Sequence, residues 1–79
     1  MRIDKFLKVS RVIKRRTLAN EACSRDKVAI NGKVAKPGTE VHVGDVVEIR
    51  FGENLTKFKI LRIAEHVKKE ESGEMYELL

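Results

Sequence analysis

The first eleven residues carry apolar side chains at the spacing of a helix. Ile3, Phe6, Leu7 and Ser10 stand at positions i, i+3, i+4 and i+7, which places them on one face that packs against a core. Asp4 falls in the first turn, where a carboxylate interacts favourably with the helix dipole. The pattern therefore predicts a helix that opens the chain.

A second helical pattern follows after a break. Its apolar positions are Leu18, Ala19, Ala22 and Cys23. Four polar residues, 14–17, separate it from the first pattern, so the two apolar stripes do not share one register. We expect a turn near Val12–Arg15 and a second helix from about Arg16 to Arg25. Neither Gly nor Pro marks this turn, so only the change of register predicts it.

Beyond residue 27 the pattern changes from helix to strand. Apolar runs at Val28–Ile30 and Val34–Ala35 flank Asn31-Gly32-Lys33, and an Asn-Gly pair between such runs is a strong hairpin signal. Val46–Phe51 alternates apolar and polar residues, with Phe51 on the apolar face. Lys57–Ile60 alternates likewise, and this strand is expected to extend as far as residue 63.

The C-terminal segment completes the predicted domain. Residues 66–74 are mostly charged and read as a solvated loop, and residues 75–79 fit a last short strand. Helices followed by strands predict an α+β fold, with the helix pair packed on a small antiparallel sheet. We expect residues 1–65 to form the domain and residues 66–79 to complete it. The expected core residues are Phe6, Leu7, Leu18, Ala22, Val28, Ile30, Val47 and Ile49.

Charge is divided unevenly between the two halves of the chain. Residues 1–36 hold eleven Lys and Arg against three acids, a balance of +8, whereas residues 37–79 hold six against nine, a balance of −3. A small domain with its cations on one end is typical of a protein that binds a polyanion. The leading candidate for that polyanion is nucleic acid.

The cations concentrate where the second helix begins. Lys14, Arg15 and Arg16 are consecutive, and cations are unfavourable at a helix N-terminus because the dipole is positive there. A bound phosphate would be held by the free backbone N–H groups and by these side chains together. We therefore expect a phosphate site here. The alternative is that the long side chains simply extend into water.

Other chemistries find little support in the sequence. The two His residues are far apart and have no Cys or His partner nearby, so no zinc spacing is present. We expect no cofactor, no metal and no catalytic pair, hence no enzyme. The one cysteine, Cys23, lies among apolar residues and is expected to be a reduced, buried thiol, with a reactive thiol as the alternative. No signal peptide or membrane span is recognisable, so we expect a cytoplasmic protein.

The aromatic residues give a further indication of binding mode. Phe6, Phe51 and Phe58 fit buried faces, and only Tyr76 is a candidate for an exposed stacking residue. Stacking of bases on an aromatic platform is therefore not the expected mode. Recognition of RNA shape and backbone by a basic helical face fits better.

The order of motifs resembles a known family. Arg16-Thr17-Leu18-Ala19, then Val28–Val34 with its Asn-Gly-Lys hairpin, then Val43-Gly44-Asp45, resemble the RNA-binding domain named after ribosomal small-subunit protein S-four. The resemblance covers roughly residues 1–51 and implies a helix pair on a small sheet, with the helical face on RNA. Many members carry Gly where this chain has Asp26, so the helix cap there is expected to persist at some cost.

One branch of that family is similar over nearly the whole chain. The opening residues 1–11, the run 13–19, Arg50-Phe51-Gly52 and Met75-Tyr76 resemble the RqcP proteins of bacterial ribosome-associated quality control. The resemblance implies a monomer that binds large ribosomal subunits obstructed by peptidyl-tRNA, contacting rRNA and the tRNA. It also implies a partner, an RqcH-type quality-control factor, and a role in alanine tailing of the stalled chain.

The resemblance and the distribution of charge together give a set of expected RNA contacts. By resemblance, Arg2 and Arg16 are carried over first. The complete set of expected RNA-binding residues is Arg2, Lys5, Lys8, Arg11, Lys14, Arg15, Arg16, Thr17, Asn31 and Lys33. Three alternatives stay open at this point: a module serving an rRNA- or tRNA-modifying system, a heat-shock-type recycler of stalled large subunits, and a DNA-binding protein using the same basic helices.

Overall fold

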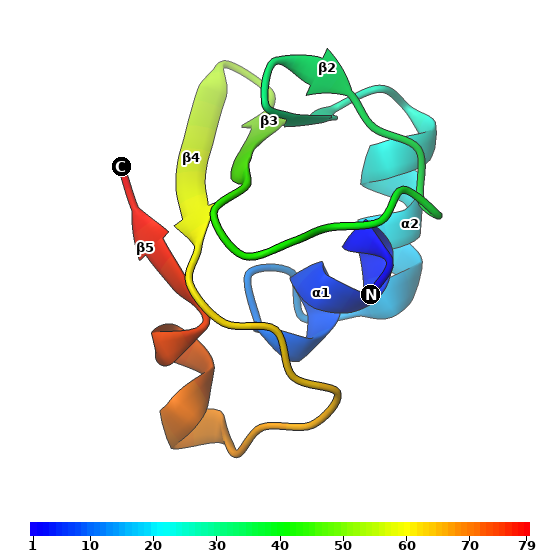
Figure 1. Cartoon of the computed structure of the whole chain (residues 1–79). Helices are drawn as coiled ribbons and strands as arrows, with labels where there is room; N and C mark the ends of the chain where they lie inside the picture. The colour runs from blue at the N-terminus through cyan, green and yellow to red at the C-terminus, as the bar shows by residue number, and fades with distance from the viewer.

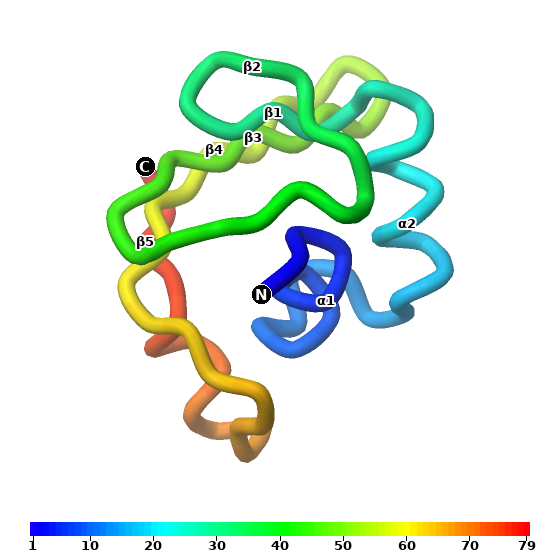
Figure 2. Tube along the Cα trace, turned by 45° about the vertical axis from the view of Figure 1, so that its right-hand side comes forward, coloured from blue at the N-terminus to red at the C-terminus, as the bar shows by residue number.

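The computed structural model describes all of residues 1–79 and contains two helices, five strands and a 3-10 helix. The two helices and the first three strands are α1 (Ile3–Val9), α2 (Arg16–Ser24), β1 (Val28–Ile30), β2 (Lys33–Val34) and β3 (Val46–Phe51). The later elements are β4 (Asn54–Ile60), η1 (Lys69–Glu74) and β5 (Tyr76–Leu78). In both views of the chain, α2 lies on one side of the molecule, and β5 and the 3-10 helix lie on the other (Figures 1 and 2).

The helix pair is confirmed, and the structure explains how α1 ends without Gly or Pro. Arg11 adopts a left-handed φ of +63°, and its N–H donates to the Lys8 carbonyl at 3.1 Å. Ile13 then folds back, donating from its N–H to the Leu7 carbonyl at 3.0 Å, and its side chain is buried. The left-handed conformation of Arg11 thus ends α1 and is followed by the burial of Ile13. Sequence periodicity alone reveals neither feature.

The second helix ends as the sequence predicts, with Asp26 as the left-handed residue. Asp26 has φ of +60°. Its N–H donates to the Cys23 carbonyl at 3.2 Å, and the N–H of Lys27 donates to the Ala22 carbonyl at 3.0 Å. These two bonds form a Schellman motif, which satisfies carbonyls that the helix leaves free. The Asp26 carboxylate also accepts a 2.8 Å bond from Lys36.

All five strands form one antiparallel sheet in the order β2-β1-β3-β4-β5. The β1–β2 hairpin pairs Ile30 with Lys33, so Asn31 and Gly32 make a two-residue turn with φ of +51° and +84°. Positive φ at both positions is what a type I′ turn requires. The predicted hairpin is confirmed. The strand predicted at 57–63 instead starts earlier, at Asn54, and ends at Ile60.

The core lies between the helix pair and one face of the sheet. Phe6 stacks on Phe58 with ring centroids 6.2 Å apart, and Tyr76 meets the edge of Phe58 at 5.3 Å. The predicted core residues that are buried are Phe6, Leu7, Ala22, Val28, Ile30, Val47 and Ile49. Leu18 was also expected there, and that prediction is wrong because its side chain is 52% exposed. Phe51 is likewise 45% exposed, although it shares the inward face of β3.

The segment after β4 is more ordered than the predicted solvated loop. Residues 69–74 form η1, in which Ser72 is buried and donates from its hydroxyl to the Lys69 carbonyl at 2.7 Å. Val67 packs against the core, and Met75 is completely buried within it. β5 then pairs with β4. Because residues 66–74 are highly charged, the core positions of Val67 and Met75 cannot be recognised from the sequence.

Cys23 is a buried, free thiol, as expected. Burial raises the pKa of this thiol to about 11, and the negative charge of Asp4 adds to the rise. Because the thiolate is the reactive form, such a thiol is inert at neutral pH. The longest helix has nine residues, and no helix of the chain is able to cross a membrane.

Candidate nucleic-acid interface

A buried carboxylate, that of Asp4, joins the two helices at their N-terminal ends. Asp4 is only 1% exposed. Its Oδ2 accepts hydrogen bonds from Arg2 Nη2 at 3.2 Å and from Asn20 Nδ2 at 3.5 Å. Its Oδ1 accepts the Lys5 backbone N–H at 2.8 Å and lies 3.6 Å from Arg16 Nη2. One carboxylate therefore holds two guanidinium groups and an amide.

Backbone contacts and helix packing hold Arg2 and Arg16 beside Asp4 without a ligand. The backbone of Arg2 forms an isolated antiparallel β-bridge with Glu40, and the Arg2 carbonyl accepts the Phe6 N–H at 3.0 Å. Arg16 is the first residue of α2, and packing of α1 on α2 brings it to Asp4. The two arginine side chains remain 53% and 49% exposed. They therefore keep donors free for a ligand, and two positive charges share one negative charge.

The N-terminus of α2 is open beside this arginine pair. The N-cap residue, Arg15, provides no side-chain cap, and the first helical bond runs from the Ala19 N–H to the Arg15 carbonyl. The N–H groups of residues 16–18 therefore have no partner. An open hollow here is lined by Asp4, Arg16, Thr17 and Asn20. Backbone donors and guanidinium groups converge at this point, which is the arrangement that binds phosphate oxygens.

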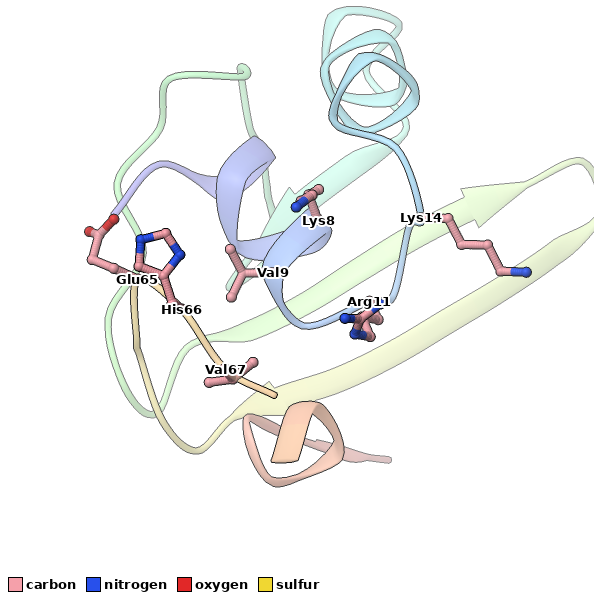
Figure 3. Close-up of a pocket in the computed structure, with 7 residues that line it drawn as sticks. All are labelled: Lys8, Val9, Arg11, Lys14, Glu65, His66 and Val67. Carbon is pink, nitrogen blue, oxygen red and sulfur yellow. The ribbon is translucent and has the colours of Figure 1, made fainter. Parts of the chain in front are cut away.

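A second group of cations surrounds the turn between the helices. Lys8, Arg11 and Lys14 line a shallow pocket with Val9 and with residues 65–67. In Figure 3, Lys14 extends away from the other side chains, whereas His66 lies beside Glu65 and near Val9. Lys8, Arg11 and Lys14 form no ion pair within the chain. Their charges are free to meet an anion.

Lys5 and Arg15 differ in how freely they present their charge. Lys5 donates to the Glu65 carboxylate, and this bond and the lysine charge lower the pKa of Glu65. Lys5 is thus partly neutralised within the chain. Arg15 is exposed and has no carboxylate partner. Of the expected contacts on the helices, Lys5 is the one whose charge is already engaged by an exposed acid.

Two expected contacts lie apart from this surface. Asn31 uses both ends of its amide internally: its Nδ2 donates to Asp45 at 3.0 Å, and its Oδ1 accepts the Val46 N–H at 2.9 Å. These bonds fasten the β1–β2 turn to the start of β3. Lys33 stands in the same hairpin, which lies apart from the α1–α2 turn in both views (Figures 1 and 2).

The organising role of Asp4 and Asn20 was not predicted from the sequence. The position of Asp4 in the first turn was explained by the helix dipole alone. A sharper signal was available, since Asp4 directly follows buried Ile3 and precedes Leu7 by three residues, on the edge of the buried face. An acid at the edge of a core, among cations, predicts a buried ion pair. Nothing in the sequence indicates that Asn20 joins it.

Comparison with known proteins identifies the family of this chain. The model of the S4 domain family matches residues 1–47. An RQC P-site tRNA stabilizing factor from Halalkalibacterium halodurans is 54% identical over 78 residues, covering 99% of this chain and 89% of that protein. The factor of the same name from Bacillus subtilis is 47% identical over 79 residues, covering 100% and 92%. The trimeric structure of Vibrio cholerae Heat Shock Protein 15 has a TM-score of 0.90 and 30% identity, covering 100% of this chain and 81% of that one.

The fold and the basic helix pair define an S4-type RNA-binding protein. The chain belongs to the S4 domain family and, within it, to the family of RQC P-site tRNA stabilizing factors, which are non-enzymatic RNA-binding factors of ribosome-associated quality control.

Proposed function

We propose that this chain binds large ribosomal subunits obstructed by peptidyl-tRNA and stabilises the tRNA in the peptidyl site. The observation that carries the proposal is the arginine pair, Arg2 and Arg16, held by buried Asp4 beside the open N-terminus of α2. The relatives' name, RQC P-site tRNA stabilizing factor, supplies the biological setting.

The proposed interface divides its work between two kinds of cation. Arg2 and Arg16 are held in position and are suited to directional, bidentate contacts with phosphate oxygens. Around them, the unpaired side chains of Lys8, Arg11, Lys14 and Arg15 supply attraction that does not depend on sequence. Thr17 adds a hydroxyl at the helix N-terminus. Lys5 contributes when its ammonium group leaves the Glu65 carboxylate and contacts an RNA phosphate instead. Asn31 and Lys33 are left out, because Asn31 is engaged internally and Lys33 stands in the β1–β2 hairpin, apart from the α1–α2 turn.

The wider role proposed for the chain includes a partner protein. An RqcH-type factor would deliver alanyl-tRNA to the same obstructed subunit, and the chain would support alanine tailing by holding the peptidyl-tRNA still. We propose that the chain acts as a monomer in the bacterial cytoplasm. Light scattering of the purified protein tests the oligomeric state, and a trimer like that of the Vibrio cholerae relative would contradict this part.

A second candidate function is recycling of stalled large subunits in the manner of a heat-shock protein. It is favoured by the structural likeness to Heat Shock Protein 15 and by 32% identity to a homologue from Aeromonas salmonicida. That homologue is longer, since the chain spans 52% of it. Deleting the gene separates the two functions. Loss of alanine tails on stalled chains supports the quality-control role, whereas intact tailing with accumulated obstructed subunits supports the recycling role.

Co-sedimentation tests the proposed function. The full chain, purified with an affinity tag, is mixed with vacant large subunits, with large subunits carrying peptidyl-tRNA, and with intact ribosomes. The expected result is preferential binding to the subunits that carry peptidyl-tRNA. Equal binding to all three particles, or none, would overturn the proposal.

A further inference from the structure

A hollow on the far flank of α2 is separate from the Asp4 cluster, which we define as Asp4 with Arg2, Arg16 and Asn20. Its apolar lining comes from Ile13, Leu18, Ala22 and Phe51, and its volume is about 230 Å³. We call it the Phe51 hollow. At 3.6 residues per turn, Leu18 and Arg16 project about 200° apart around the helix axis. The hollow is therefore a separate feature from the arginine pair, on the opposite flank of the same helical turn.

The apolar side chains of the hollow are exposed together. Single exposed apolar residues are ordinary, but Leu18 and Phe51 come from elements far apart in sequence and line one hollow together with Ile13, which is buried. Phe51 stands on the inward face of β3 at the end of that strand, where it meets the flank of α2 instead of the closed core. Phe51 remains 45% exposed. A concave site with an accessible aromatic face is suited to a flat apolar ligand.

The charges at the rim identify the kind of ligand. Lys27 lines the hollow and has no carboxylate partner. Arg25 and Glu21 also line it, and they neutralise each other, because the Arg25 guanidinium donates to the Glu21 carboxylate at 2.9 Å. At the other end, Leu18 contributes one of the unpaired N–H groups at the start of α2. An apolar floor beside the unpaired charge of Lys27 complements a nucleotide, whose base has apolar faces and whose phosphates are anionic.

We propose that the Phe51 hollow binds an unstacked nucleobase, which stacks on the Phe51 ring while Lys27 contacts a neighbouring phosphate. Unpaired bases in RNA loops and bulges are commonly recognised by stacking on aromatic side chains and guanidinium planes. This inference rests on the proposed function, since RNA held at the N-terminus of α2 passes within one helical turn of Leu18. It adds base stacking to an interface that otherwise contacts the RNA backbone.

Nuclear magnetic resonance on the full chain tests the proposal. The probes are single-stranded octaadenylate, an abasic octamer with the same phosphates, and inorganic phosphate. We expect octaadenylate, unlike the other two probes, to shift the methyl resonances of Ile13 and Leu18 through the ring current of the bound base. We also expect octaadenylate to bind about tenfold more weakly to Phe51→Leu than to the natural chain, because one stacking contact is lost.

The variants separate stacking from general hydrophobic contact. Phe51→Leu keeps an apolar side chain but has no π face, whereas Phe51→Trp retains one and is expected to preserve octaadenylate affinity. Leu78→Ala removes another exposed apolar side chain, on β5, and is expected to change nothing. Thermal melting of each variant establishes that the fold is intact.

Three results would overturn the proposal. The first is equal octaadenylate affinity for Phe51→Leu and the natural chain. The second is a preference of the hollow for an acidic, apolar peptide over octaadenylate, which would make it a protein-docking site. The third is methyl shifts that depend on protein concentration without RNA, which would make it an interface between copies. None of these results affects the binding of peptidyl-tRNA-bearing subunits, so failure here is distinguishable from failure of the proposed function.

Discussion

Asp4 Oδ1 and Arg16 Nη2 lie 3.6 Å apart, and this contact joins the first turn of α1 to the first residue of α2. Arg2 reaches the other oxygen of the same carboxylate at 3.2 Å. A buried carboxylate needs partners because water cannot reach it. The charged partners that stabilise Asp4 are the residues proposed to bind RNA, so folding and RNA recognition depend on the same contacts.

Arg16→Ala is expected to lower both stability and binding. It leaves Asp4 with Arg2, Asn20 and the Lys5 N–H, so the free energy of unfolding should fall by only about 1 kcal/mol. Association with large subunits should be lost, and Arg2→Ala should behave alike. Chemical denaturation and co-sedimentation measure the two effects.

Arg15→Ala is the control for these two variants. Arg15 is exposed and has no acidic partner, so its removal should leave stability within about 0.5 kcal/mol and weaken binding only modestly. If Arg15→Ala abolishes association as completely as Arg16→Ala does, positioning by Asp4 has no special role.

RNA affinity should depend steeply on salt. The six cations proposed to contact phosphates are Arg2, Lys8, Arg11, Lys14, Arg15 and Arg16. Neutralising about six phosphates releases counterions, so affinity should fall on the order of a thousandfold between 50 and 200 mM salt. Fluorescence anisotropy with a labelled rRNA fragment measures the slope. A flat titration would show that this basic surface is not where RNA binds.

Cys23 should make the chain lose stability at high pH. Its pKa is raised from 9.0 to about 11 in the folded chain. The contribution of the protonated thiol to the free energy of unfolding is therefore complete below pH 9 and is lost as the pH rises through 11. The difference corresponds to roughly 2–3 kcal/mol. Urea unfolding between pH 8 and 11 should show a steeper loss for the natural chain than for Cys23→Ala. Parallel pH profiles for the two proteins would mean that the thiol is not protected by burial.

Much of the fold was predictable because its signals are local. The spacing of Ile3, Phe6 and Leu7 defines one helical face, and Asn31-Gly32 supports two consecutive residues of positive φ. Leu18 and Phe51 were misassigned because their exposure depends on where the end of β3 meets the flank of α2. That relationship is set by tertiary packing, which periodicity does not describe.

The candidate site was predictable in its charge but not in its organisation. The consecutive cations 14–16 stand out in the sequence, and Arg15 and Arg16 are the N-cap and the first residue of α2. The Asp4 cluster, however, brings residue 4 together with residues 2, 16 and 20. Only the packing of α1 on α2 creates that approach. The burial of Met75 is hidden in the same way, since a charged segment precedes it.

The variant Asp4→Asn tests the central claim, that a buried carboxylate positions the arginines for RNA, most directly. It raises the net charge by one, so simple electrostatic attraction predicts tighter binding to large subunits carrying peptidyl-tRNA. Glu77→Gln makes the same charge change on exposed β5, where it forms no ion pair, and serves as the matched control. Our account predicts that Asp4→Asn binds at least tenfold more weakly than the natural chain at a temperature where both are folded, whereas Glu77→Gln binds equally well or slightly better. Tighter binding by both variants would contradict the account.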